Sequence, residues 1–150
     1  MTDERGERTP EDWPYFDEDP LRVERLEDRD DGRGAAFYLP AEILEWLGPV
    51  AEVHLVAARP GAVRGNHVHQ RRREVILVRA SGPWELAWRP PGGDAARRTF
   101  REPGAWLLAV EPGTPHAVKN LGEDDLVILS CSSGHHDPDD PDTERVRLFD

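Results

Sequence analysis

Two histidines and a glutamate lie close together in the sequence, with the residue types and spacing of metal ligands. One residue separates His67 from His69, and Glu74 follows five positions after His69. Because alternate side chains of an extended strand lie on one face, the two imidazoles point the same way, and a short turn can bring the carboxylate beside them. Imidazole and carboxylate donors suit Zn, Mn, Fe, Ni or Co. We therefore predict a site for a divalent transition metal, whose identity these donors leave open.

A histidine far along the chain is the predicted fourth ligand. His116 lies in the turn-rich segment Gly113-Thr-Pro-His-Ala-Val-Lys-Asn120, which leads into another apolar run. The alternative interpretation of the four residues is a metal-free pocket whose polar groups hydrogen-bond to one another. A buried glutamate without a cation tends to keep its proton, whereas a dication favours the ionised form.

The two segments resemble the two motifs of the cupin superfamily. In the first motif a glycine, both histidines and the glutamate are matched, and the closing glycine comes one position late, at Gly82. In the second motif His116 and Asn120 are matched, but Glu111 stands in the proline position and Pro112 follows it. The resemblance implies a double-stranded β-helix, or jelly-roll barrel, in which both segments meet at one metal.

The residues around the first motif, Arg64-Gly-Asn-His-Val-His, resemble more specifically the cupins of deoxysugar and capsular polysaccharide biosynthesis. That branch includes sugar-nucleotide epimerases, ketoisomerases and the C-terminal cupin of capsule-assembling reductases. The ketoisomerase relatives need no metal and usually carry glutamine at the position of Glu74, so Glu74 favours the metal-holding members. The resemblance implies a metal-binding enzyme that acts on a small keto-sugar nucleotide by epimerisation or isomerisation next to the carbonyl.

Three further residues are candidates within this interpretation. Arg64 is the candidate for binding the diphosphate of the substrate. His54 and Lys119 are the candidate catalytic residues, because strand parity can aim His54 into the barrel as the base and Lys119 can reach the pocket mouth. If the histidines of both motifs all bind the metal, none of them is left to act as the base.

Two other classes of function stay open. One is a metal-dependent oxygenase or hydrolytic cupin, which needs an open coordination position. The other is a non-catalytic module that holds a metal or a small ligand. Dioxygen consumption with iron bound would identify an oxygenase, and a binding module would show neither this reaction nor turnover of sugar nucleotides.

Short strand-like segments separated by turns predict an all-β, single-domain sandwich or barrel. The segments are 21–26, 51–58, 74–79, 84–89, 97–101, 105–110 and 126–131. A short helix is predicted before the barrel, opened by Pro40 and closed by Gly48, with Ile43, Leu44 and Leu47 on one side.

The net charge of −11 belongs to the two ends of the chain. Residues 1–31 carry 13 acidic and 5 basic side chains, and residues 137–150 carry 6 and 2, which leaves 11 acidic and 12 basic residues between them. We therefore expect a flexible acidic N-terminal segment over 1–20, a cupin barrel over 21–136 and a loosely ordered acidic tail over 137–150. The middle offers no basic stripe for nucleic acid. The resemblance to sugar-nucleotide cupins implies a small-molecule substrate as the partner.

Length and composition fit a single cytoplasmic domain. The 150 residues suffice for one core, and the single cysteine excludes an internal disulfide and fits a reducing compartment. No apolar run approaches the roughly 18 residues of a membrane span, and residues 1–20 lack the apolar core of a signal peptide. The resemblance to sugar-nucleotide cupins implies a homodimer.

Overall fold

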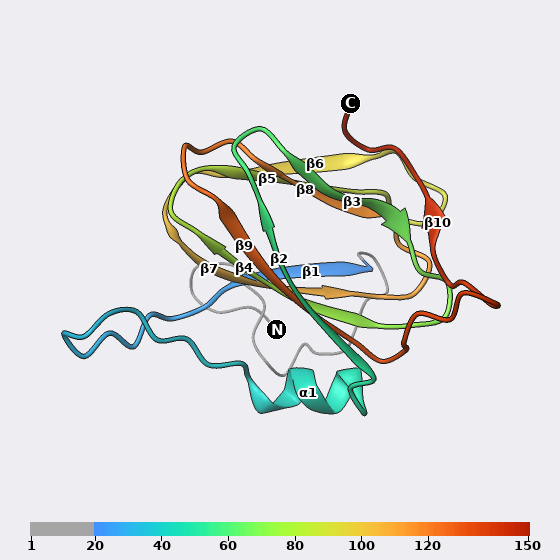
Figure 1. The fold of residues 1–150 in the computed structure, drawn as a ribbon, viewed down its shortest axis with the longest axis horizontal. Coiled ribbons are helices and arrows are strands. Elements are labelled where there is room, and N and C mark those ends of the chain that lie inside the picture. Colours follow the sequence, from blue (N-terminus) through green and yellow to red (C-terminus); the bar gives the residue numbers. More distant parts are fainter. Residues whose placement is uncertain (1–19) are drawn as a thin grey trace.

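Two five-stranded antiparallel sheets pack face to face in the computed structural model, which describes residues 20–150 (Figure 1). The first sheet has the order β1 (Leu21–Arg25), β7 (Gly104–Val110), β4 (Glu74–Ala80), β9 (Leu126–Ser132) and β2 (Glu52–Ala58). The second has the order β10 (Glu144–Arg145), β3 (Val63–Val68), β8 (His116–Asn120), β5 (Trp84–Trp88) and β6 (Ala96–Phe100). The predicted all-β class is confirmed.

Aromatic side chains fill much of the space between the sheets. Trp84 stacks on Phe100 with ring centroids 4.4 Å apart, and Trp106 packs edge-on against both. All three are buried, and aliphatic side chains of β4, β7 and β9 surround them. The rings constrain the strand register, because a slip of one residue would move each ring to the other face of its sheet.

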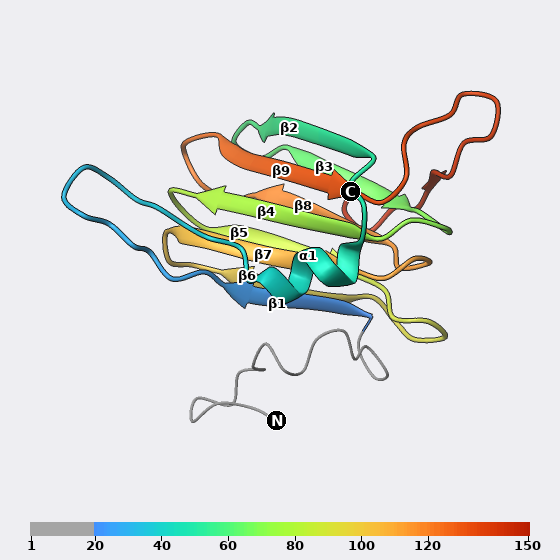
Figure 2. The same ribbon diagram turned by 90° about the horizontal axis from the view of Figure 1, so that it is seen from below.

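The one helix within residues 20–150, α1 (Ala41–Leu47), lies against the outer face of the first sheet, as Figure 2 shows. Ile43, Trp46 and Leu47 are buried there, whereas Leu44 is 47% exposed. The prediction that Leu44 shares the buried side is therefore wrong. Positions i, i+3 and i+4 lie on one helical face, and counting from Ile43 these are Trp46 and Leu47.

The second sheet contains two strands, β3 and β8, that the strand pattern did not include. They pair antiparallel, and their register shifts between Gly65 and His67. Gly65 has φ +97, and a Cβ there would lie 2.7 Å from the backbone oxygen of His116. A glycine is needed at this bulge both for the positive φ and for the close approach of the two strands.

The acidic C-terminal tail is more ordered than the sequence predicts. Residues 144 and 145 form β10 beside β3, at the edge of the second sheet in Figure 1. Leu148 and Phe149 are buried, and their backbone N–H groups donate to the side-chain oxygen of Asn66 at 3.0 and 3.2 Å. These apolar and backbone contacts hold the end of the tail against the second sheet.

Two further predictions concern the N-terminal segment and membrane spans. The flexible segment over 1–20 lies outside the described residues except for Pro20. Among residues 20–150, no helix has both the length and the apolar character needed to cross a membrane.

Candidate metal centre

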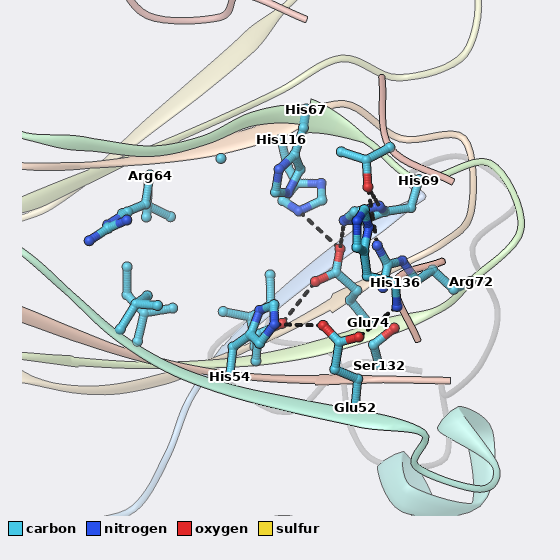
Figure 3. Close-up of a pocket in the computed structure, with 17 residues that line it drawn as sticks. Glu52, His54, Arg64, His67, His69, Arg72, Glu74, His116, Ser132 and His136 are labelled. Carbon is cyan, nitrogen blue, oxygen red and sulfur yellow. Dashed lines mark hydrogen bonds and ion pairs between the residues drawn. The ribbon is translucent and has the colours of Figure 1, made fainter. Parts of the chain in front are cut away.

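A cavity of about 520 Å³ opens between the two sheets, and the predicted metal ligands lie in its wall (Figure 3). Strands β2, β4 and β9 supply one side of this cavity, and β3 and β8 supply the other. One part of the wall is apolar, formed by Val56, Ile76, Val118 and Ile128. The polar part carries the histidines, so a bound ligand would meet both kinds of surface.

His67, Glu74 and His116 come together from three different strands. Each offers a ligand atom, and these three atoms lie within 4.8 Å of one another. Glu74 and His116 are buried, with 6% and 3% of their surface exposed, and His67 is half-buried. The bulge at Gly65 lets β3 approach β8 closely enough for His67 and His116 to be register partners. The geometry predicted for these three residues is therefore present.

The ring of His116 is oriented by the backbone. Its Nδ1 lies 2.9 Å from the carbonyl oxygen of Thr114, so Nδ1–H donates to that oxygen. The lone pair is then on Nε2, which lies 3.5 Å from Glu74 Oε1. A carbonyl partner on the far nitrogen is the usual way in which proteins fix a metal-binding imidazole.

His69 lies beside the group of three and is held in the same way. Its Nδ1 is 3.0 Å from the carbonyl oxygen of Asp142 and 3.2 Å from Thr143 Oγ1, both in the C-terminal tail. Its Nε2 lies 2.9 Å from Glu74 Oε1. The ring centroids of His69 and His116 are 6.3 Å apart. The structure thus brings all four predicted ligands into contact, with Glu74 at the centre and His69 at the side.

The electrostatics of the cluster follow from burial and from the central carboxylate. Desolvation acts to raise the pKa of Glu74, but hydrogen bonds and charge from His116 and His69 outweigh it and hold that pKa well below its usual range. Desolvation acts to lower the pKa of His116, but the interactions with Glu74 and with the Thr114 carbonyl outweigh it and raise that pKa. Desolvation and the neighbouring imidazoles lower the pKa of His67 to about 4. His67 is therefore neutral, and Glu74 charged, at neutral pH.

A divalent ion fits this arrangement. Glu74 Oε1 and His116 Nε2 are both buried, and the imidazole nitrogens beside Oε1 are Nε2 of His69 at 2.9 Å and Nε2 of His116 at 3.5 Å. The other oxygen, Oε2, accepts a hydrogen bond of 2.8 Å from Ser130 Oγ. A carboxylate oxygen facing imidazole lone pairs is unfavourable unless a proton or a cation lies between them. The donor set of nitrogen and oxygen atoms is the one that borderline divalent metals accept.

Two of the three other candidate residues line the cavity, and the third does not. His54 and Arg64 line the cavity from β2 and β3. In Figure 3 Arg64 lies across the cavity from the histidine cluster, and its Nε and Nη2 donate to the carbonyl oxygen of Ala57 at 3.1 and 2.9 Å. Lys119 belongs to the opposite face of β8, because His116 and Val118 line the cavity and alternate residues face away. Lys119 is therefore not part of the site.

Several residues that shape the cavity were missed at the level of sequence. Glu52 contacts His54, and Ser130 and Thr143 contact the cluster. Arg72 lines the cavity and is buried, where its Nη1 donates to the carbonyl oxygen of Gly134 at 3.0 Å. For Glu52 the signal was present, because it lies two positions before His54 and so shares its strand face. The others come from distant segments and carried no local signal.

Comparisons with known proteins agree with the fold. A family model described as "Polysaccharide biosynthesis C-terminal domain" matches residues 42–144. No curated protein matches the chain. The structure of the capsular polysaccharide assembling protein CapF from Staphylococcus aureus is similar, with 25% identity and a TM-score of 0.58, over 82% of this chain and 33% of CapF. This chain therefore spans about a third of CapF.

Two further structures cover almost the whole fold. A dTDP sugar isomerase from Desulfovibrio desulfuricans G20 has a TM-score of 0.70 at 16% identity, over 85% of this chain and 83% of that chain. A mutant of the 3,4-ketoisomerase QdtA from Thermoanaerobacterium thermosaccharolyticum, in complex with TDP-4-keto-6-deoxyglucose, has a TM-score of 0.64 at 16% identity, over 84% and 87%. The predicted cupin-like fold, related to CapF and the sugar ketoisomerases, is confirmed.

Proposed function

This chain belongs to the polysaccharide biosynthesis C-terminal domain family, and from that premise we propose that it is a metal-dependent enzyme acting on a keto-sugar nucleotide. The reaction is epimerisation or isomerisation next to the carbonyl. The observation that carries the proposal is the buried group of His67, Glu74 and His116 at the wall of a ligand-sized cavity. The named structural neighbours include sugar isomerases, and one of them holds a keto-sugar nucleotide.

The proposed metal ligands are His67, Glu74 and His116, with His69 beside them. A bound divalent ion would supply Lewis-acid polarisation of the carbonyl group. The protein's part is to keep Glu74 ionised and to present the Nε2 lone pair of His116, which it does through Ser130 and the Thr114 carbonyl.

His54 is the proposed base, because it lines the cavity on the sheet opposite His67 and His116. It takes the proton from the carbon next to the carbonyl, and the electron pair of the broken C–H bond moves to the carbonyl oxygen. Return of the proton to the other face of the same carbon gives the epimer. Return to the former carbonyl carbon, with loss of a proton from the neighbouring hydroxyl, gives the isomeric keto sugar.

Arg64 is the proposed residue for the diphosphate. It lies across the cavity from the cluster in Figure 3, as an elongated ligand with a keto sugar at one end and a phosphate at the other requires. Guanidinium binds phosphate oxygens through parallel N–H groups. A homodimer, a cytoplasmic location and a barrel ending near residue 136 stay predictions.

The proposal is tested by proton exchange. Protein loaded with Zn, Mn, Fe, Co or Ni is incubated in D₂O with TDP-4-keto-6-deoxyglucose and its UDP counterpart. We expect deuterium at the carbon next to the keto group, detected by NMR, with loaded protein and not with metal-free protein. Glu74→Gln, which is matched in shape, should lose both the metal and the exchange. Absence of exchange with every metal and both nucleotides would refute the enzyme proposal.

One observation favours the second candidate function, a non-catalytic binding module. The chain spans only 33% of CapF, so reactions of that protein can reside in its other parts. A module of this kind would retain the metal and bind a sugar nucleotide, measured by calorimetry, without exchanging any proton of the ligand.

A further inference from the structure

The metal proposal leaves few groups in the cavity that can move a proton. The carboxyl and imidazole side chains that line it belong to Glu52, His54, His67, His69, Glu74, His116 and His136. The histidine cluster and Glu74 are committed to the ion, and arginine does not lose its proton in proteins. That leaves Glu52, His54 and His136 as groups outside the cluster.

Glu52 and His54 form a pair on β2. Glu52 Oε1 lies 2.5 Å from His54 Nε2, and the two side chains share a strand face. The exposed fractions differ, at 20% for Glu52 and 63% for His54. The carboxylate is thus the sheltered member of the pair, and the imidazole is the member that a ligand can reach.

A distant segment fixes the carboxylate in place. Glu52 Oε2 accepts a hydrogen bond of 2.7 Å from the backbone N–H of His136, which follows β9. This hydrogen bond, opposed by desolvation and aided by nearby positive charge, lowers the pKa of Glu52. An ionised carboxylate accepts hydrogen bonds only, so the imidazole nitrogen facing it must carry a proton.

We propose that Glu52 is a positioning residue that holds His54 in the Nε2-protonated tautomer and leaves the Nδ1 lone pair to take the substrate proton. The backbone N–H of His136 holds Glu52 in turn. This inference rests on the proposed function and names the group that sets the base. The carboxylate also stabilises the imidazolium formed when Nδ1 accepts the proton.

Three variants separate the roles. Glu52→Gln keeps the shape of the side chain but replaces one carboxylate oxygen with an NH₂ group. If the remaining oxygen still accepts the hydrogen bond from the backbone N–H of His136, the NH₂ group faces His54. Nε2 of His54 must then accept, which moves the proton to Nδ1. His54→Gln removes the base itself. His136→Gln is the matched control, because the bond to Glu52 comes from the backbone and survives the change.

The first readout is the tautomer, measured by long-range ¹H–¹⁵N NMR on metal-free protein. We expect wild type and His136→Gln to show a protonated Nε2 at His54, and Glu52→Gln to show a protonated Nδ1. An unchanged tautomer in Glu52→Gln would overturn the positioning role, whatever the enzyme's substrate is.

The second readout is deuterium exchange into TDP-4-keto-6-deoxyglucose by metal-loaded protein. His54→Gln and Glu52→Gln should lower kcat for exchange by about 100-fold or more, with KM changed by less than about threefold. The metal content of both variants should match that of wild type. Exchange by His54→Gln at the wild-type rate would overturn this inference and the assignment of His54 as the base, but not the proposal that the protein is a metal-dependent enzyme. Exchange absent from wild type would overturn the proposed function as well.

Discussion

At the scale of single residues, the site depends on which nitrogen of each histidine carries a proton. His116 and His69 both have Nδ1 beside a backbone carbonyl oxygen, from Thr114 and Asp142. Both rings therefore present Nε2 to Glu74. The sequence could predict that these residues meet, because motif spacing and strand parity are local. It could not predict the tautomers, because the carbonyl beside His69 comes from Asp142 in the distant tail and the one beside His116 depends on the turn at Thr114.

Removal of single ligands should release the metal without unfolding the sheets. We expect Glu74→Gln and His67→Ala to weaken zinc binding by at least about 100-fold, because each removes a donor from the group of three. Competition with a chromophoric chelator measures the affinity, and circular dichroism measures the fold. His136→Ala, which changes a residue lining the same cavity, should bind zinc as wild type does. Equal zinc affinity in all four proteins would contradict the ligand assignment.

Metal binding should also release a proton. The pKa of His116 is raised in the metal-free protein, so between its usual value of 6.5 and the raised value His116 still holds a proton that the metal must displace. His67, with a pKa of about 4, is already neutral there. Zinc affinity should therefore fall as the pH decreases through this range, by about tenfold per pH unit for one proton. Calorimetry in two buffers of different ionisation enthalpy counts the protons; a count of zero at pH 6.5 would contradict a raised pKa of His116.

At the scale of elements, the missed strands are those that hold the histidines. β3 and β8 carry Arg64, Asn66, Lys119 and Asn120, and these polar residues mask the alternation that revealed the other strands. Strands β4 and β7 were predicted because their residues are nearly all apolar and buried. Functional segments give up regular patterning to carry ligands, so propensity predicts them least well.

Because β3 approaches β8 closely, we expect alanine substitutions at two glycines to differ in their effect on stability. Gly65 and Gly61 both have positive φ, of +97 and +79, but only at Gly65 would a Cβ meet another strand. Gly61→Ala should lower the free energy of unfolding by about 1 kcal/mol from backbone strain alone. Gly65→Ala should lower it by about 3 kcal/mol or more, because the Cβ pushes against the backbone of His116. Urea unfolding measures both; equal losses would show that the close approach is unimportant.

At the scale of the whole molecule, the C-terminal tail runs from the site to the outer face of the second sheet. Its Asp142 and Thr143 contact His69, while Phe149 is buried against the outer face of the second sheet under the guanidinium of Arg97. Its acidic composition led to the expectation of a loose segment. The sequence shows three apolar residues near the end of the tail, Val146, Leu148 and Phe149. The surface on which they pack exists only after the second sheet has formed.

Truncation of the tail's anchor should therefore cost stability. Phe149→Ala should lower the free energy of unfolding by about 3 kcal/mol, since a 3% exposed ring is removed. Leu55→Ala is the control, because Leu55 is 72% exposed and should change stability by less than about 0.5 kcal/mol. Thermal and urea unfolding compare the two variants. A Phe149→Ala protein as stable as Leu55→Ala would show that the tail does not hold the fold.

The proposed function depends on one divalent ion bound by His67, Glu74 and His116. A crystal of zinc-loaded protein, measured on both sides of the zinc absorption edge, locates the ion directly. We predict one anomalous peak per chain, about 2.0–2.2 Å from a nitrogen of His67, a nitrogen of His116 and an oxygen of Glu74. A peak elsewhere, or a cluster whose side chains keep their contacts with no peak between them, would contradict the metal centre.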